Sequence, residues 1–342
     1  MKFNSVHRYG SLLLIFCLLA AVLCGCGKAE VIDLGVPEGE QDVFPSELFI
    51  DASPELFDFE LEAVPLASAP AAVSTVLMPV ASGTTVYSNE KAAIDASNTK
   101  DGYVMIKYKG KETARLKIQI VGPSGVAYTY NLNTAGTYEV FPLSDGSGTY
   151  KIGIFQNVSG TKYASLYSKS IDVKLADQFA PFLRPNQYVN YSSTSTAVAK
   201  AAELVKDCKT NLEKVSAVYH FVVNNMTYDT AKAQSVQSGY LPVVDDVLAA
   251  KKGICFDYAA LMCAMLRSQG VPCKLVVGYT GEVYHAWINT YSAESGWVEG
   301  VIFFDGTTWK LMDPTFASSG KSSKAVMTYI GNGSNYSAKY LY

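Results

Sequence analysis

The stretch from Lys252 to Gln269, KGICFDYAALMCAMLRSQ, constrains the fold more than any other part of the chain. Gly253 marks the end of a loop, and apolar residues then recur at helical spacing, which predicts a helix that begins close to Cys255. At the start of a helix, free backbone N–H groups and the positive end of the helix dipole favour a thiolate over a thiol. Cys255 is therefore a candidate nucleophile.

A histidine and an aspartate that follow Cys255 in the chain have the chemistry that a cysteine nucleophile needs. His285 lies in the segment YHAWI and Asp313 in the segment LMDPT. An imidazole deprotonates the thiol and later protonates the leaving amine, and a carboxylate on the other ring nitrogen fixes the tautomer. On a strand, Trp287 would share a face with His285 and shield the ion pair from water. The chain thus supplies a nucleophile, a base and an orienting carboxylate.

The segments GICFDYA, YHAWI and DPT, in this order, resemble the signature of the transglutaminase-like superfamily, as found in bacterial extracellular and lipoprotein members. The resemblance covers about Ser195 to Phe316. It implies a papain-like α+β fold with Cys255 as nucleophile, His285 as general base and Asp313 as the third catalytic residue. The family includes cross-linking acyltransferases, peptidases, amidases and inactive members. The resemblance implies no cofactor, and we expect no metal site.

The oxyanion hole is less defined by the sequence. The backbone N–H of Cys255 is one candidate donor, and a second donor would come from residues 226–239. The resemblance favours Tyr228, in the segment MTYD, while Gln234 and Gln237 are alternatives. Tyr228 would otherwise be an aromatic packing residue at the end of a helix.

The N-terminus has the pattern of an export signal, residues 1–26. Lys2 and Arg8 precede the unbroken apolar run Leu12–Leu23, which is too short to span a bilayer as a helix. The run ends in LCGC, which resembles the lipobox of bacterial lipoproteins, so that Cys26 would be lipidated and become the new N-terminus. A plain secretory signal is the alternative. We therefore expect a protein anchored by lipid on the extracellular face of a bacterial membrane.

Residues 27–85 have the composition of a disordered tether. They are acidic and rich in proline, and no Lys or Arg occurs from Ala29 to Glu90. Low hydrophobicity with charge of one sign predicts disorder. The formal net charge of the whole chain is −3, and no basic run occurs in it, so we do not expect a nucleic-acid partner.

Residues 86–176 alternate between apolar and polar side chains, as in Tyr103–Tyr108, with Gly-rich turns between the runs. This spacing predicts an all-β immunoglobulin-like sandwich. The segment contains neither His nor Cys. We therefore expect it to be a spacer or a binding module.

Residues 177–194 read as a linker, and residues 195–342 as the transglutaminase-like domain. Helical periodicity occurs in Thr196–Lys206 and Leu212–Asn225, and a loop is expected over Met226–Val243. A further helix precedes Cys255, and strand patterns follow it, over 274–279, 283–289, 298–304 and 309–312. The unit would thus be a helical half with Cys255, packed on an antiparallel sheet that carries His285 and Asp313.

The remaining cysteines of the body are Cys208, Cys263 and Cys273. Cys263 follows Cys255 on the same helix at a rise of roughly 12 Å, too far for a disulfide between them. A bridge between Cys208 and Cys273 stays open, and Cys263 and Cys273 fit core packing.

The favoured function is a surface-anchored cysteine hydrolase, a peptidase or amidase that works through a thioester intermediate. Its substrates would be peptides, proteins or cell-wall peptides. Two alternatives stay open. One is a protein cross-linking acyltransferase, and the other is a binding or scaffold lipoprotein without catalysis, in which Cys255 is an inert buried thiol.

Overall fold

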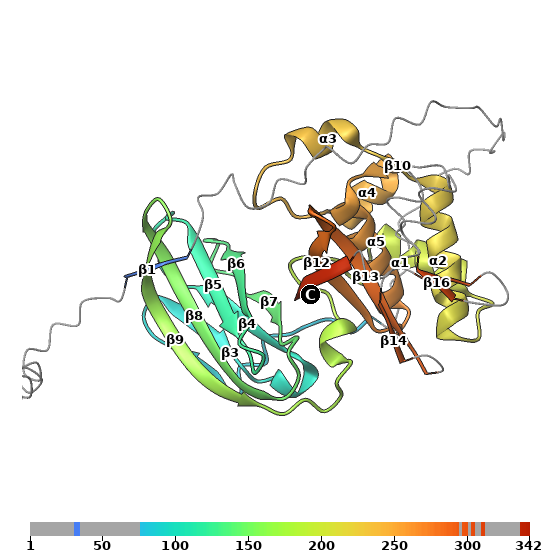
Figure 1. Ribbon diagram of the computed structural model, residues 1–342. Helices are drawn as coiled ribbons and strands as arrows, with labels where there is room; N and C mark the ends of the chain where they lie inside the picture. Colours follow the sequence, from blue (N-terminus) through green and yellow to red (C-terminus); the bar gives the residue numbers. More distant parts are fainter. Residues whose placement is uncertain (1–30, 35–75, 294–295, 300–301, 305–308, 312–335) are drawn as a thin grey trace, which may run out of the picture.

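The computed structural model describes residues 31–34, 76–293, 296–299, 302–304, 309–311 and 336–342 (Figure 1). Within these ranges, a half built of β-strands comes first in the chain, and a half that contains the α-helices follows it. None of the helices in these ranges is long and apolar enough to cross a membrane.

The all-β half consists of two antiparallel sheets that pack face to face (Figure 1). One sheet has the order β1-β9-β8-β5-β6 and the other has the order β2-β3-β4-β7. The first sheet contains β1 (Val31–Asp33), β5 (Leu116–Val121), β6 (Ala127–Leu132), β8 (Gly148–Ser159) and β9 (Lys162–Val173). The second contains β2 (Val86–Ser88), β3 (Ala92–Asp95), β4 (Tyr103–Tyr108) and β7 (Glu139–Pro142).

The sequence alternation matches the two faces of these strands. Leu116, Ile118 and Ile120 of β5 are buried, whereas Lys117 and Gln119 between them are half-buried on the outer face. Side chains of successive strand residues point to opposite faces, so one face packs into the core and the other stays polar. The alternation that the sequence predicted is therefore present in β5, with a polar outer face, whereas the immunoglobulin-like topology stays a prediction.

The predicted tether is ordered in two places. Val31–Asp33 is a strand that pairs antiparallel with β9, and the described residues from 76 onward run beside the sandwich, where the backbone N–H of Gly83 donates to Asp95 at 2.7 Å. The expectation of disorder over 27–85 is wrong for these parts. The physical reason is that an outer strand leaves backbone donors and acceptors that a short segment can satisfy. The remainder of 27–85 lies outside the described residues.

The segment 177–194 is packed against both halves. Its short helix η3 (Ala180–Phe182) is buried, and the Arg184 guanidinium lies 3.5 Å from the carboxylate of Asp101 in the sandwich. The Tyr188 ring stacks on the Tyr342 ring at a centroid distance of 4.0 Å. The segment therefore joins the two halves through side-chain contacts as well as through the chain.

The second half combines helices with a four-stranded antiparallel sheet of order β14-β13-β12-β17 (Figure 1). Its helices are α1 (Thr196–Val205), α2 (Asn211–Asn225), α3 (Thr230–Ser235), α4 (Val244–Ala250) and α5 (Cys255–Ser268). The strands of the sheet are β12 (Cys273–Thr280), β13 (Val283–Ser292), β14 (Gly296–Val298) and β17 (Tyr336–Leu341). Two further pairs join β10 (Thr227–Tyr228) to β11 (Lys252–Gly253), and β15 (Ile302–Phe304) to β16 (Trp309–Leu311).

Helix α5 is the centre of this half. Every residue from Cys255 to Ser268 is buried, and α1, α2, α4, β12 and β13 all pack against it. A helix that is apolar on all sides is stable only inside a core. The helix predicted from the sequence, beginning at Cys255, is confirmed.

One charged side chain ends this helix inside the core. Arg267 is 1% exposed, and its guanidinium donates to the backbone carbonyl oxygens of Cys273 at 2.8 Å, Arg184 at 2.8 Å and Tyr342 at 2.5 Å. These carbonyls belong to β12, the connecting segment and the residue after β17. Arg267 therefore joins three parts of the chain that are far apart in the sequence.

Two elements differ from the sequence expectation. The expected loop over 226–243 contains helix α3, whose N-cap Asp229 accepts a hydrogen bond from the Lys232 N–H at 2.9 Å. The tail contains β17, which pairs with β12 through a register shift between Val277 and Gly278. Helix α3 is a single short turn stabilised by its cap, and such turns leave little periodicity in a sequence.

Candidate functional site

Cys255 is the first residue of α5, and it is 2% exposed. The preceding residues Lys252–Gly253 form β11, which pairs in parallel with β10. At the start of the helix, the N–H of Tyr258 donates a hydrogen bond to the carbonyl oxygen of Ile254 at 3.1 Å. The thiol therefore lies at the N-terminus of a long buried helix, the end at which a helix has free backbone N–H groups and the positive end of its dipole.

A buried charge pair fixes the start of this helix. Asp257 is fully buried, and its carboxylate accepts hydrogen bonds from the N–H of Ile254 at 2.8 Å, the ammonium of Lys232 at 2.6 Å and the hydroxyl of Tyr240 at 2.5 Å. Burial first, and then the bond to Asp257, raise the pKa of Tyr240. Asp257 thus caps the first turn and also anchors the segment 230–240 beside Cys255.

The glycine before the nucleophile is required by this arrangement. A Cβ at Gly253 would lie 2.6 Å from the Cβ of Asp257, which is closer than carbon atoms approach in proteins. A side chain here would push Asp257 away from the N–H of Ile254. The glycine in GIC therefore makes room for the carboxylate that caps the helix.

His285 lies on β13, directly across from Gly278 on β12, and it is 5% exposed. Strand β13 packs against α5, the helix that begins with Cys255. A Cβ at Gly278 would lie 2.1 Å from the backbone oxygen of Ser337 and 2.8 Å from the Trp287 ring. The strand opposite His285 therefore needs a glycine.

Trp287 is buried beside His285, as the alternation of strand faces predicts. The two ring centroids are 6.3 Å apart with an angle of 22° between the planes. The Trp287 ring also meets Tyr336 of β17 edge-on at 5.2 Å. These contacts place aromatic rings next to the imidazole.

Tyr228 belongs to β10 and pairs with Gly253, two residues before Cys255. Its side chain is half-buried, and the N–H of the next residue, Asp229, donates to the Gly253 carbonyl at 2.9 Å. The segment that carries Tyr228 is therefore tied to the loop before the nucleophile. Gln234 and Gln237 are exposed.

Two predicted site residues, Asp313 and Cys26, lie outside the described residues. Asp313 as the orienting carboxylate and Cys26 as the lipidated residue therefore stay predictions. Within the part of the chain that the structure describes, no group of three or more His, Cys, Asp or Glu side chains is placed to hold a metal ion.

The cysteine pairing left open by the sequence is corrected by the structure. The sulfur of Cys273 lies 3.1 Å from the sulfur of Cys263, and both residues are fully buried free cysteines. Burial first, and then the hydrogen bond with Cys263, raise the pKa of Cys273. A bridge between Cys208 and Cys273 is therefore wrong, because Cys273 packs against Cys263 across α5 and β12.

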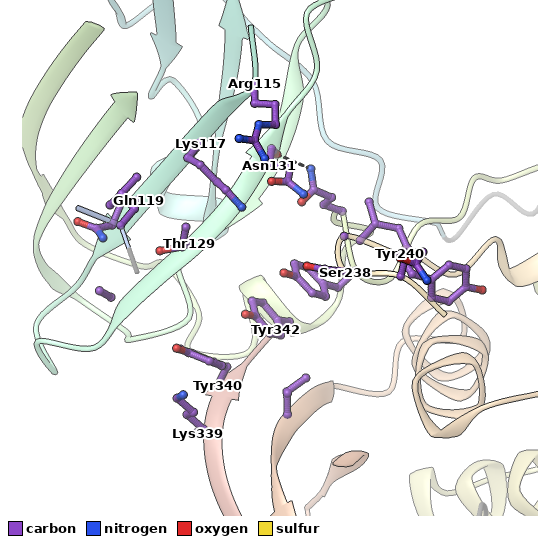
Figure 2. A pocket seen from close by; sticks show the side chains of 18 of the residues that line it. Arg115, Lys117, Gln119, Thr129, Asn131, Ser238, Tyr240, Lys339, Tyr340 and Tyr342 are labelled. Atoms are coloured by element: carbon purple, nitrogen blue, oxygen red, sulfur yellow. Dashed lines mark hydrogen bonds between the residues drawn. The ribbon is translucent and has the colours of Figure 1, made fainter. Parts of the chain in front are cut away.

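A cavity of about 530 Å³ lies between the outer face of the sandwich and the second half (Figure 2). Neither Cys255 nor His285 lines it, although Phe256 and Tyr284, their chain neighbours, do. The sequence did not reveal this cavity, because its walls come from stretches that are far apart in the chain, among them β5, β6 and β17. Nor did the sequence reveal the group of Lys232, Tyr240 and Asp257, whose members come from three elements.

Comparison with known proteins finds a family match within the second half. Residues 198–300 match the model of the transglutaminase-like superfamily. The chain is 32% identical to human Kyphoscoliosis peptidase over 133 residues, which are 37% of this chain and 20% of that protein. It is 29% identical to the uncharacterized protein YebA of Bacillus subtilis, over 29% of this chain and 16% of YebA.

The chain thus spans about a fifth or less of the length of these curated relatives. Among solved structures, red sea bream transglutaminase aligns with 11% identity over 67% of this chain and 53% of that chain, at a TM-score of 0.30.

Proposed function

Residues 198–300 form a transglutaminase-like domain, and from this premise we propose that the protein is a cysteine hydrolase that cleaves peptide or protein amides. The observation that carries the proposal is the place of Cys255, at the N-terminus of a fully buried helix that packs against the strand of His285. Such a place puts the Cys255 sulfur at the positive end of the helix dipole, and the strand supplies a base.

The reaction proceeds in two steps, the formation of a thioester on Cys255 and its hydrolysis. The Cys255 thiolate attacks the amide carbonyl, and the tetrahedral intermediate collapses as the C–N bond breaks. His285, as the imidazolium, gives its proton to the departing amine, which leaves a thioester on Cys255. Water then loses a proton to His285 and attacks the thioester. The C–S bond then breaks, which releases a carboxylic acid and restores the Cys255 thiolate beside the His285 imidazolium.

Three residues support these steps in the proposal. Asp313 accepts a hydrogen bond from His285 and fixes its tautomer. Tyr228 and the backbone N–H of Cys255 stabilise the oxyanion, supported by the pairing of β10 with β11, which ties the Tyr228 segment to the residues before Cys255. Trp287 excludes water from the ion pair, and its burial beside the imidazole supports that role.

Hydrolysis is favoured over transfer to an amine. Water is the acceptor that needs no second binding site, whereas a cross-linking enzyme has to hold an amine next to the thioester. The similarity to a protein named a peptidase also supports hydrolysis.

The domain would have the papain-like fold, with boundaries at 195–342, behind an immunoglobulin-like sandwich over 86–176.

The location of the protein is part of the proposal. The apolar run and the LCGC segment support a lipid anchor on Cys26, on the extracellular face of a bacterial membrane. Substrates within reach would be peptides, surface proteins and cell-wall peptides. A Cys26→Ser variant, expressed with a radiolabelled fatty acid, is expected to lose the label and to leave the membrane fraction.

A mixed assay tests hydrolysis against its alternatives. The protein is incubated with β-casein in ¹⁸O-labelled water with dansylcadaverine as the amine, and the products are read by mass spectrometry. We expect new peptide C-termini that carry ¹⁸O and little dansyl label. The Cys255→Ala variant should produce neither, and Cys208→Ala, a matched free cysteine outside the site, should behave as the wild type.

Other outcomes decide between the alternatives. Dansyl label on glutamine side chains without new C-termini would replace the hydrolase with an acyltransferase. If the wild type produces no more of either product than Cys255→Ala, while both remain folded, the catalytic proposal fails in favour of a scaffold.

A further inference from the structure

The cavity between the two halves is a candidate second site. It has a volume of about 530 Å³, inside the range of about 300–1,000 Å³ typical of ligand pockets. One wall is the outer face of β5 and β6, and the other is formed by β17, the hairpin of β12 and β13, and the loop 236–241 (Figure 2). Pockets of this size between two packed units are common ligand sites.

The cavity is separate from the candidate catalytic pair. Tyr284 lines the cavity and His285 is the next residue on β13, so their side chains point to opposite faces of the sheet. On the neighbouring strand, Val277 and Tyr279 line the cavity, whereas Gly278, the partner of His285, does not. A ligand in the cavity would therefore lie across the sheet from the imidazole.

The charge of the lining favours an anion. Arg115, Lys117 and Lys339 line the cavity, against one acidic side chain, that of Asp33, among the lining residues. Figure 2 shows Arg115 and Lys117 on the sandwich wall and Lys339 on the strand opposite. Cations from both walls place a positive field across the cavity in a protein whose formal net charge is −3.

The neutral lining suits a chain of amide groups. Tyr279, Tyr284 and Tyr340 present aromatic rings with hydroxyl groups, and Asn131 and Gln187 present side-chain amides. The Gln187 amide donates to the backbone carbonyl of Asn131 at 2.8 Å and to the Glu139 carboxylate at 3.0 Å, so the Asn131 carbonyl of β6 points to this side of the strand. Tyrosine rings and amides together bind peptide groups through packing and hydrogen bonds.

The position of β6 points to an extended peptide. It is the last strand of its sheet, and its residues Ala127, Thr129 and Asn131 line the cavity. An outer strand offers backbone donors and acceptors on its free side, and extended peptides bind such strands by adding to the sheet. A saccharide would use the rings and cations but not this row of backbone groups.

We propose that this cavity binds acidic peptide segments, with carboxylates on Arg115, Lys117 and Lys339 and the peptide backbone along β6. The site goes beyond the proposed hydrolysis, because none of its groups takes part in the chemistry of Cys255. It gives the protein a means to hold an acidic peptide or protein, whatever is cleaved at the other face.

Binding is measured in the full chain with Cys255→Ala, so that no probe is cleaved. The probe is a fluorescein-labelled oligopeptide of alternating glutamate and glycine, followed by fluorescence anisotropy. A peptide with glutamine at each glutamate position should bind at least about tenfold more weakly. Raising the salt from about 0.05 M to about 0.5 M should weaken binding of the acidic peptide, because the charges lie near solvent.

Variants of the cavity locate the site. Lys117→Gln and Lys339→Gln, one from each wall, should each weaken binding by about threefold to tenfold, and the double variant by more. Lys151→Gln is the matched control, since Lys151 is exposed on β8 of the same sheet and does not line the cavity. It should leave binding unchanged, and thermal unfolding should show that all variants are folded.

Three results would overturn the proposal. The first is equal binding of the glutamate and glutamine peptides. The second is a loss on Lys151→Gln as large as that on Lys117→Gln and Lys339→Gln. The third is tighter binding of fluorescein-labelled tetragalacturonate than of the acidic peptide, which would assign the cavity to an acidic saccharide. None of these results depends on catalysis at Cys255, so this site and the proposed hydrolase can fail separately.

Discussion

The two halves of the protein bury their apolar residues in different ways. The sandwich buries every second residue of a strand such as β5 and leaves the others on a polar outer face. The second half buries all sides of α5, from Cys255 to Ser268. Polar groups can therefore vary on the outer face of the sandwich, whereas in the second half they occur at the ends of a buried helix, where each needs a defined partner.

The charges of the two halves follow the same division. In the sandwich, Glu112 is paired with Lys91 at the exposed surface. In the second half, Asp257 and Arg267 are fully buried at the two ends of α5 and make three hydrogen bonds each. Changes to the buried charges should thus have far larger effects than changes to the exposed pair.

Replacement of Arg267 should have the largest effect. Arg267→Met keeps the length of the side chain but removes the donor to three carbonyl oxygens, of which that of Tyr342 keeps another donor, the Leu275 N–H. We expect the free energy of unfolding to fall by about 3–5 kcal/mol. Urea unfolding followed by circular dichroism measures the change. Lys200→Met on α1, which removes a partly exposed pair with Glu203, should change stability by less than about 0.5 kcal/mol. Equal losses of stability in Arg267→Met and Lys200→Met would contradict the expected difference between buried and exposed charges.

Replacement of Asp257 should rank second. Asp257→Asn removes the charge that pairs with Lys232, and we expect a loss of about 1–3 kcal/mol in the free energy of unfolding. The double variant with Lys232→Met should be less destabilised than the sum of the single changes, because it no longer leaves the half-buried ammonium without its carboxylate partner. Simple additivity in urea unfolding would show that the two groups do not interact.

The contact between the halves should contribute less. Tyr188→Leu removes the stack on Tyr342 and should lower the free energy of unfolding by about 1 kcal/mol. Differential scanning calorimetry should then show the transitions of the two halves moving apart. A single unchanged transition would mean that the halves are joined by other contacts, such as those of Arg267.

The exposed pair of the sandwich should show the smallest effect, and only at low pH. Hydrogen bonds from Lys91 first, and then from Tyr108, lower the pKa of Glu112 from 4.5 to about 2. Because the folded pKa lies below the unfolded value, the contribution of Glu112 is present above pH 4.5 and is lost as the pH falls toward 2. NMR titration of the carboxyl carbon should give a midpoint near the lower value. Lys91→Gln should raise this midpoint, and an unchanged midpoint would contradict the pairing.

The sequence predicted the parts of the fold that repeat a period. The alternation in β4 and β5 and the helical spacing of α5 are each set by local burial, and these elements are confirmed. The strands β1 and β17 were not predicted, since each is stabilised by pairing with a strand far away in the chain, β9 and β12 respectively. Long-range pairing leaves no local pattern to read.

The candidate site also has parts that the sequence predicted and parts that it did not. Cys255 was placed at a helix start and His285 on a strand from short segments, and the structure has them on packed elements. The partners of Asp257, Lys232 and Tyr240, were not predicted, because a loop and a short helix bring them there. The catalytic roles of Cys255, His285, Asp313, Tyr228 and Trp287 stay predictions for experiment.

The rate of alkylation of Cys255 by iodoacetamide as a function of pH, with peptide mapping, tests the catalytic account most directly. Cys208 is an internal reference, because burial first, and then Glu213 and Asp207, raise the pKa of its thiol. We predict that Cys255 reacts well below the ordinary thiol pKa of about 8.5, and at least about tenfold more slowly at that pH in His285→Ala. If Cys255 fails to react, or follows the same pH dependence as Cys208 in both proteins, it is an inert buried thiol and the transglutaminase-like domain is a scaffold.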